Sequence, residues 1–297
     1  MKDLYAEITN GIIEQLEQGV IPWKKPWTGV NSGAISHATG RAYSLLNQML
    51  LARPGEYITF NQCKQEGGKV KKGAKAKIVV FWKVLPREKK DAAGNVVTDK
   101  DGKTIIEGLP VLRYFQVFHI DDCEGIAPKW ENKLPAVAAP DERAESVLMG
   151  YVRRENIRFE NTISDEAYYS PSADYIHLPI MEQFGSTAEY YATAYHEATH
   201  STGHATRLNR FEKGIASAAF GSESYSKEEL VAEIGSACCL HEIGLETPST
   251  FKNSAAYIQS WLRVLKDDKR MIISAAARAE KAVKLIFNIT DKQEQGE

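Results

Sequence analysis

Apolar residues recur every four positions between Leu4 and Leu16. This spacing places their side chains on one face of a helix. We therefore predict a helix over 3–19, and the apolar residues of 43–52 predict a second, shorter helix.

Two later segments have the composition of strands. Residues 76–84 and 112–120 are rich in β-branched and aromatic side chains, and residues 91–103 between them contain Gly, Asn and Asp. β-Branched and aromatic residues favour strands, whereas Gly, Asn and Asp favour turns. The sequence therefore predicts a long hairpin, and we expect a mixed α and β first half.

The second half is predicted to be helical with a small sheet. An apolar stripe from Ile272 to Ile286 indicates a last helix with one face on the core. We predict the α+β class for the whole chain. The expected strands are 157–159, 167–169 and 175–178, and the expected helices are 141–154, 186–203, 226–243, 251–266 and 268–287.

Charge divides the chain of 297 residues into two halves. Residues 1–140 carry 20 Lys and Arg against 15 Asp and Glu, a net charge of +5, and residues 141–297 carry 17 against 24, a net charge of −7. Segment 126–140 contains three prolines and has no apolar period, as expected of a linker. We predict two domains, 1–130 and 142–297, joined by a linker at 131–141.

Several classes of protein are disfavoured by the sequence. No apolar run approaches the roughly 18 residues of a membrane helix, and the first residues lack a secretory signal pattern. The four cysteines form no CxxC pair, so we expect a reducing cytoplasm and no membrane partner. Phosphate-binding glycine motifs are also missing from the sequence.

The strongest chemical signal is His196-Glu-Ala-Thr-His200, which lies in a predicted helix. Residues four apart share a helix face, so His196 and His200 can both bind one metal ion. Glu197 lies beside the first histidine, where it can act as the general base on a water. This is the HExxH arrangement, with Glu197 as the catalytic residue.

A catalytic metal also needs a third protein ligand. A histidine six residues after His200 would complete one common pattern, but Thr206 stands at that position. His204 is close in sequence, and we place it behind the ligands or facing a substrate.

The next predicted helix offers the better third ligand. Glu229 and Glu233 are one turn apart, so Glu229 is assigned as the metal ligand and Glu233 as the group that orients an imidazole. Glu228 points about 100° away from Glu229 and is expected to be solvated. We expect one divalent ion per chain, with zinc as the first choice and manganese or another divalent ion as the alternatives.

Further residues are candidates for a substrate cleft. Strand 174–178 precedes the HExxH helix and, as an edge strand, can hold an extended peptide. Tyr175 and His177 then line the cleft, or else they only pack there. Tyr225 or Tyr195 can donate a phenol to an oxyanion, although a structural role is the better prediction for each.

The basic half contains candidates for nucleic-acid binding. Segment 21–27 combines two tryptophans with two lysines, and segment 64–90 holds ten basic and two acidic residues. Aromatic rings that stack on bases, together with lysines that contact phosphates, are typical of single-stranded DNA binding. The alternative is that the tryptophans are core residues between solvated lysines. The candidates are Trp23, Lys24, Lys25, Trp27, Lys71, Lys72 and Trp82.

Segments of both halves resemble one family, the ArdC-type antirestriction proteins, whose N-terminal domain is shared with TraC-type plasmid primases. The matching segments are 21–27, 40–50 and 81–82 in the first half, and 175–179, 190–204, 207–208 and 229–233 in the second.

The resemblance implies an N-terminal domain that binds single-stranded DNA, with Arg41 and Tyr43 among its contacts. It implies a C-terminal zincin-like metallopeptidase domain whose metal ligands are His196, His200 and Glu229. It also implies a role in protecting incoming plasmid DNA from host restriction during conjugation. We expect a peptidase that acts on a protein such as a component of the restriction system. The alternative is a DNA-coating protein whose metal is structural or regulatory.

Overall fold

The computed structural model of the chain describes residues 3–18, 21–24, 33–51, 53–91, 94–130, 140–184, 186–211, 223–245 and 254–289. It contains both helices and sheets, and the predicted α+β class is confirmed. Residues 1–57 and 127–297 form one compact unit, and residues 58–126 form a second. The units do not follow the order of the two predicted domains. The boundary at 131–141 stays a prediction, and residues 131–139 lie outside the described residues.

The first unit joins the N-terminal residues to the last helices. Helix α1 packs against α7, and α2 packs against α8. Asp3 caps α1 by accepting from the Ala6 N–H over 3.2 Å and forms an ion pair with Lys269, whose carbonyl accepts from Thr9 over 2.6 Å. The elements are α1 (Leu4–Glu17), the short helix η1 (Pro22–Lys24), α2 (Leu45–Leu51), α7 (Ser254–Asp267) and α8 (Met271–Ile286).

Helix α6 (Glu223–Ile243) is the centre of the first unit. It is in contact with α5 (Thr187–Ser201), α4 (Pro140–Arg154), α7, α8 and η1. Every residue from 228 to 243 is buried, as expected for a helix covered on all sides. The polar groups on this helix therefore need partners inside the protein.

A three-stranded sheet precedes α5. The sheet contains β7 (Arg158–Thr162), β8 (Tyr168–Ser170) and β9 (Tyr175–Pro179), in the order β7-β9-β8. Strand β9 pairs with β7 in parallel and with β8 in antiparallel fashion. The expectation that this strand is an edge strand is therefore wrong, because both of its edges are occupied. Strands β8 and β9 both contact α5, and the short helix η3 (Met181–Gln183) follows β9.

Two short parallel strands, β1 (Ala34–Ser36) and β2 (Gly55–Thr59), were not predicted by the sequence pattern. Buried His37 forms a hydrogen bond with Glu56, which is itself buried in β2. Glu56 also accepts from the backbone N–H groups of Lys129 and Trp130 over 2.8 and 2.7 Å. The Trp130 ring covers Gly40, where an added Cβ would approach it to 2.7 Å.

The second unit has a small core made of Ile58, Cys63, Ile120 and Cys123. Thr59 and Gln62 form a capping box at the start of α3 (Phe60–Gln65). Strand β3 (Lys69–Val70) pairs with β6 (Cys123–Glu124), which follows the short helix η2 (Ile120–Asp122).

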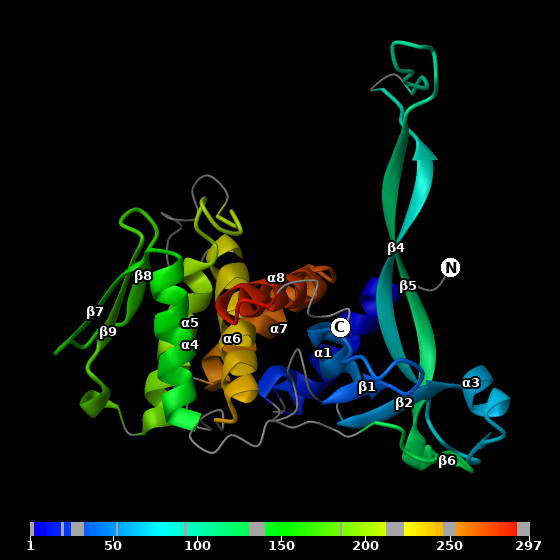
Figure 1. The fold of residues 1–297 in the computed structure, drawn as a ribbon, viewed down its shortest axis with the longest axis horizontal. Helices are drawn as coiled ribbons and strands as arrows, with labels where there is room; N and C mark the ends of the chain where they lie inside the picture. The colour runs from blue at the N-terminus through cyan, green and yellow to red at the C-terminus, as the bar shows by residue number, and fades with distance from the viewer. Residues whose placement is uncertain are drawn as a thin grey trace. The chain divides into compact units, whose positions relative to one another are not determined.

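The predicted hairpin is present as a long antiparallel ribbon (Figure 1). Strands β4 (Lys77–Glu88) and β5 (Ile106–His119) pair without a break from Lys77↔Val117 to Glu88↔Ile106. Both strands are longer than predicted, because Pro86 and Pro110 weakened the strand pattern. A proline is tolerated where its missing N–H faces away from the partner strand.

Candidate metal centre

Helix α5 begins at a side-chain cap and presents one polar face. Ser186 accepts from the Glu189 N–H over 3.2 Å, and Tyr195 is fully buried with its hydroxyl donating to the Ala144 carbonyl over 2.8 Å. This contact confirms the predicted structural role of Tyr195. His196 and His200 are on another face, and their side chains are 14% and 13% exposed to solvent.

A close crossing brings α6 to this face. A Cβ at Gly235 would lie 2.6 Å from Thr199 Cγ2, so only glycine lets the two backbones approach this closely. Next to it, Ser236 donates to the Ala192 carbonyl over 2.6 Å. The crossing places the first turns of α6, which carry acidic residues, against the histidines.

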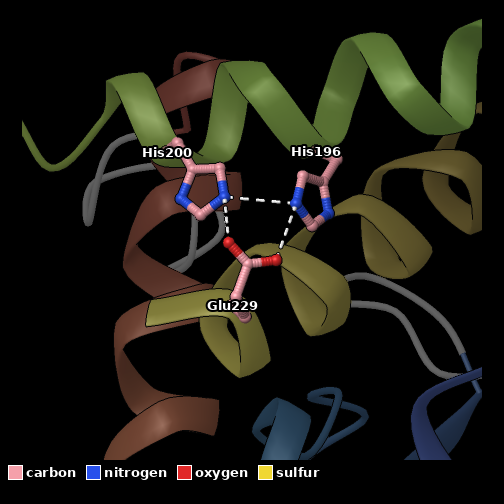
Figure 2. Close-up of side chains that lie close together, drawn as sticks. All are labelled: His196, His200 and Glu229. Atoms are coloured by element: carbon pink, nitrogen blue, oxygen red, sulfur yellow. Dashed lines mark hydrogen bonds and ion pairs between the residues drawn. The ribbon is translucent and has the colours of Figure 1, made fainter. Parts of the chain in front are cut away.

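His196, His200 and Glu229 converge, as Figure 2 shows. The two histidine Nε2 atoms are 3.1 Å apart, and Glu229 Oε2 and Oε1 lie 3.4 and 3.3 Å from those of His196 and His200. Around a tetrahedral zinc, ligand atoms are roughly 3.3 Å apart. The three side chains thus fit one divalent ion, in the ligand set expected from the helix spacing.

The electrostatics of the group are those of a cation site. Burial alone would lower the pKa of His200, but hydrogen bonds to Glu228 and Glu229 outweigh burial and raise it to about 10. Burial would raise the pKa of Glu229, but both histidines hold it well below its usual range. The carboxylate thus stays ionised and favours positive charge beside it, which a metal ion can supply.

The expectation that Glu228 is solvated is wrong. Its side chain is only 7% exposed, and Oε1 lies 3.4 Å from His200 Nδ1. Arg210 donates to both Glu228 oxygens, from Nε over 3.2 Å and from Nη2 over 2.6 Å. Helix α6 is covered on all sides. The Glu228 side chain, which points away from Glu229, therefore meets the segment after α5 rather than water.

The expected partner of His196 is present but not bonded. Glu233 is buried, and its Oε1 lies 3.9 Å from His196 Nδ1, beyond hydrogen-bond distance. Among the described residues, His196 Nδ1 is buried without a hydrogen-bond partner. The orienting role of Glu233 therefore stays a prediction.

Glu197 is buried on the same helix. Burial acts to lower the pKa of His196 and His200, but hydrogen bonds to the carboxylates of α6 and, to a smaller extent, the nearby carboxylate of Glu197 raise it. Glu197 therefore lies close enough to the ligand group to act on it electrostatically. This placement suits the expected role of Glu197 as a proton acceptor.

Three of the other cleft candidates, His204, Tyr175 and His177, do not join the ligand group. His204 accepts from the Thr206 N–H over 3.3 Å and its Nδ1 contacts the hydroxyl of that residue. Tyr175 donates to Glu160 Oε2 over 2.8 Å and packs under the Arg158 guanidinium. Buried His177 contacts the Thr162 hydroxyl over 2.8 Å. The side chain of Tyr225 lies outside the described residues.

The described part of segment 21–27 does not support the DNA prediction. Trp23 is 1% exposed and packs edge-on against Trp261, with ring centroids 5.2 Å apart. Its predicted stacking on bases is therefore wrong, and the alternative of a core tryptophan holds. Lys25 and Trp27 lie outside the described residues, and so does the side chain of Lys24.

The remaining DNA candidates lie in both units. Arg41 is exposed and Tyr43 half-buried in the first unit, and burial raises the pKa of Tyr43 to about 12. Lys71 and Lys72 are exposed in the second unit, where Lys71 Nζ donates to the Asp121 carbonyl over 2.8 Å. All ten basic residues of segment 64–90 are exposed.

The ribbon carries several exposed aromatic rings, of which only Trp82 was predicted as a DNA-binding residue. Trp82 is 50% exposed, and Tyr114 lies diagonally across from it on the same face, since Trp82 pairs with Leu112. The other face carries Phe81 and Phe115, stacked with centroids 5.0 Å apart. Successive residues of a strand alternate between faces. The adjacent aromatic residues 81–82 and 114–115 were the available signal for two aromatic faces.

Two family models match the chain. The model of the N-terminal domain of anti-restriction factor ArdC matches residues 2–118, and a zincin-like metallopeptidase model matches residues 147–278. A crystal structure of the metal-free antirestriction ArdC protein from plasmid R388 is 34% identical, with a TM-score of 0.71, and covers 96% of this chain and 97% of its own. This chain belongs to the ArdC antirestriction family.

Other relatives agree with the assignment to the ArdC family. The Mn(II)-bound ArdC structure from R388 is 33% identical, with a TM-score of 0.70 and 99% of both chains covered. A DNA primase TraC from Escherichia coli is 34% identical over 99% of this chain, which spans only 20% of that protein. The uncharacterized protein y4eC from Sinorhizobium fredii is 30% identical, with 94% of this chain and 89% of that protein covered.

The Mn(II)-bound relative and the zincin-like domain indicate that this site takes a divalent metal. Whether that metal is the expected zinc stays a prediction. In the described part of the chain, the helices are too short or too polar to span a membrane.

Proposed function

We propose that the protein is a metallopeptidase whose metal ligands are His196, His200 and Glu229. The observation that supports this best is the convergence of the three side chains, at 3.1–3.4 Å, within a domain that matches a zincin-like metallopeptidase. A divalent ion, with zinc as our first choice, would supply a Lewis acid that polarises a water and a peptide carbonyl.

The protein's own residues would then move the protons. Glu197 would accept a proton from the attacking water and pass it to the leaving amine. Its burial and its position next to His196 in α5 support this role. The edges of β7 and β8, rather than β9, are the places where a peptide strand can add to the sheet.

We also propose that the protein binds single-stranded DNA. The exposed aromatic rings of the ribbon (Phe81, Trp82, Tyr114 and Phe115) support this, together with the exposed basic residues of segment 64–90. Bases can stack on the rings while lysines contact phosphates, without sequence preference. DNA binding would concentrate the peptidase near a DNA-bound component of the restriction system. The protein would act in the cytoplasm, where it protects incoming plasmid DNA during conjugation.

Two variants test these assignments in a conjugation assay with a restricting recipient. Glu197→Gln keeps the three ligands, so it should bind metal and single-stranded DNA like the wild type but lose protection. Trp82→Ala/Phe115→Ala should keep metal and lose both DNA binding and protection. Metal content and DNA affinity are measured on the same preparations.

The second candidate function is a DNA-coating protein whose metal is structural or regulatory. The two exposed aromatic faces of the ribbon favour it, because shielding a strand needs only such a surface. Full protection by Glu197→Gln would contradict the peptidase proposal and support coating. Failure of the wild type to bind single-stranded DNA would contradict the DNA-binding proposal and the coating candidate, and would leave the peptidase proposal to the Glu197→Gln test.

A further inference from the structure

A buried polar cluster lies behind the metal ligands, and the proposed chemistry does not use it. Its centre is Arg210, whose side chain is 5% exposed. Arg210 Nη1 donates to Thr202 Oγ1 over 2.6 Å, and Nη2 donates to the Thr199 carbonyl over 2.8 Å. Since Nε and Nη2 also bond Glu228, one guanidinium ties the end of α5 to the first turns of α6.

Glu228 passes this restraint to a metal ligand. The His200 ring lies between two neighbouring carboxylates, with Nδ1 3.4 Å from Glu228 and Nε2 3.3 Å from Glu229. A partner on the nitrogen that does not bind metal fixes both the tautomer and the direction of a ligating imidazole. Arg210 in turn holds Glu228 with a planar two-pronged contact, which leaves the carboxylate little freedom to rotate.

The segment that carries Arg210 is itself held tightly. The Arg210 N–H donates to the Gly203 carbonyl over 2.9 Å. A Cβ at Gly203 would approach Phe211 to 2.7 Å and Arg210 Nη2 to 3.1 Å. Glycine at this position therefore lets the chain turn back onto α5 and directs Arg210 inward.

The two histidines differ in this respect. His196 Nδ1 has no hydrogen-bond partner among the described residues, and Glu233 is 3.9 Å away. Within the described part of the chain, then, Arg210 and Glu228 support His200 while His196 has no comparable contact.

We propose that Arg210 and Glu228 are positioning residues for metal binding: Arg210 fixes the Glu228 carboxylate, and Glu228 fixes His200 as a ligand. This inference rests on the proposed metal site. A purely structural ion pair between the segment after α5 and helix α6 is the competing explanation, and metal affinity measured apart from stability distinguishes them.

The experiment titrates the metal-free full chain with Co(II), followed by its visible absorption, and measures thermal unfolding without metal. The variants are Glu228→Gln, Arg210→Met and the double variant. Glu160→Gln is the matched control, because Glu160 forms an exposed pair with Arg158 over 2.6 Å. Glu229→Ala removes a ligand and serves as the reference for a lost site.

Each single variant should bind Co(II) about 10–100-fold more weakly than the wild type, with an altered absorption spectrum, while Glu160→Gln should not. Arg210→Met should also lose stability, because it leaves Glu228 buried without its main partner. The double variant should regain part of that stability but not the affinity.

Three results would overturn the inference. If the affinity recovers with stability in the double variant, the pair is only structural. If Glu228→Gln binds Co(II) like the wild type while Glu229→Ala does not, the metal site stands and the positioning role fails. If the wild type binds Co(II) no better than Glu229→Ala, the proposed metal site fails and the inference with it.

Discussion

The α5–α6 pair and the β4–β5 ribbon use their side chains in opposite ways. Along the described part of α6, acidic side chains are buried, and Glu228 pairs with Arg210 and Glu229 with the histidines. Along the ribbon, aromatic side chains are exposed on both faces, the basic side chains of the two strands are exposed on the face that carries Phe81, and backbone pairing joins the strands. A substitution in the helix pair should therefore change stability and chemistry together, whereas one in the ribbon should change binding alone.

The largest effect is expected at the ligand on α6. Glu229→Ala should weaken metal binding by more than about 100-fold, the upper range for residues that only support ligands. Metal content after gel filtration measures this loss. His204→Ala is the control, since its ring faces Thr206. Loss of metal in His204→Ala with retention in Glu229→Ala would reverse the ligand assignment.

The helix crossing is tested at Gly235. Gly235→Ala would press a methyl group against buried Thr199 and should cost about 1–3 kcal/mol of unfolding free energy, with a parallel loss of metal affinity. Urea unfolding and metal titration measure the two effects. Thr199→Ala in the same chain should relieve both. Gly150→Ala on α4 is the matched control, because nothing lies within 4 Å of its added Cβ.

Burial along α6 also predicts a pH dependence. Burial lowers the pKa of His241 from 6.5 to about 4. Below pH 6.5 His241 takes up a proton in the unfolded chain but not in the folded chain. The contribution of this group to stability is therefore fully present above pH 6.5 and is lost as the pH falls toward 4. Between pH 7.5 and 5 this group should account for about 2 kcal/mol.

Urea unfolding of the wild type and His241→Gln at both pH values isolates this contribution. The wild type should lose about 2 kcal/mol more than the variant over this interval. Equal losses in the two proteins would show that His241 is not held neutral in the folded state.

The smallest expected effect belongs to single rings of the ribbon. Trp82→Ala should weaken single-stranded DNA binding by about 1–2 kcal/mol with no change in thermal stability, because its ring is half exposed. Fluorescence anisotropy measures the affinity. Val84→Ala, also exposed, removes apolar surface without a ring and should have no effect. If it weakens binding equally, stacking is not the mode of binding.

The long elements could be predicted from the sequence because their hydrophobic pattern is local. The stripe on α8 is an example: Ile272, Ala276, Ala279, Val283 and Ile286 are all buried. The short elements β1, β2, β3, β6 and α3 have two to six residues each. Segments of this length give too little pattern, and their pairing depends on residues far along the chain.

In the candidate site, too, local sequence patterns predicted only part of the structure. Spacing on two helices was enough to bring Glu229 to the histidines, since helix geometry fixes which residues share a face. The partners of Glu228 depend on what covers the opposite face of α6, which no local pattern contains. The prediction for Trp23 was wrong for the same reason, because its packing partner Trp261 is far away in the sequence. A buried tryptophan and a DNA-stacking tryptophan can have similar sequence neighbours.

The Glu56 carboxylate makes residues 58–126 an insertion in the architectural sense. Its side chain lies just before the chain leaves the first unit and bonds the backbone of Lys129 and Trp130, just after the chain returns. The points of departure and return are therefore held together by residues of the host unit. A graft of residues 58–126 between relatives would therefore use these two junctions and would have to keep the contact of Glu56 with Lys129 and Trp130.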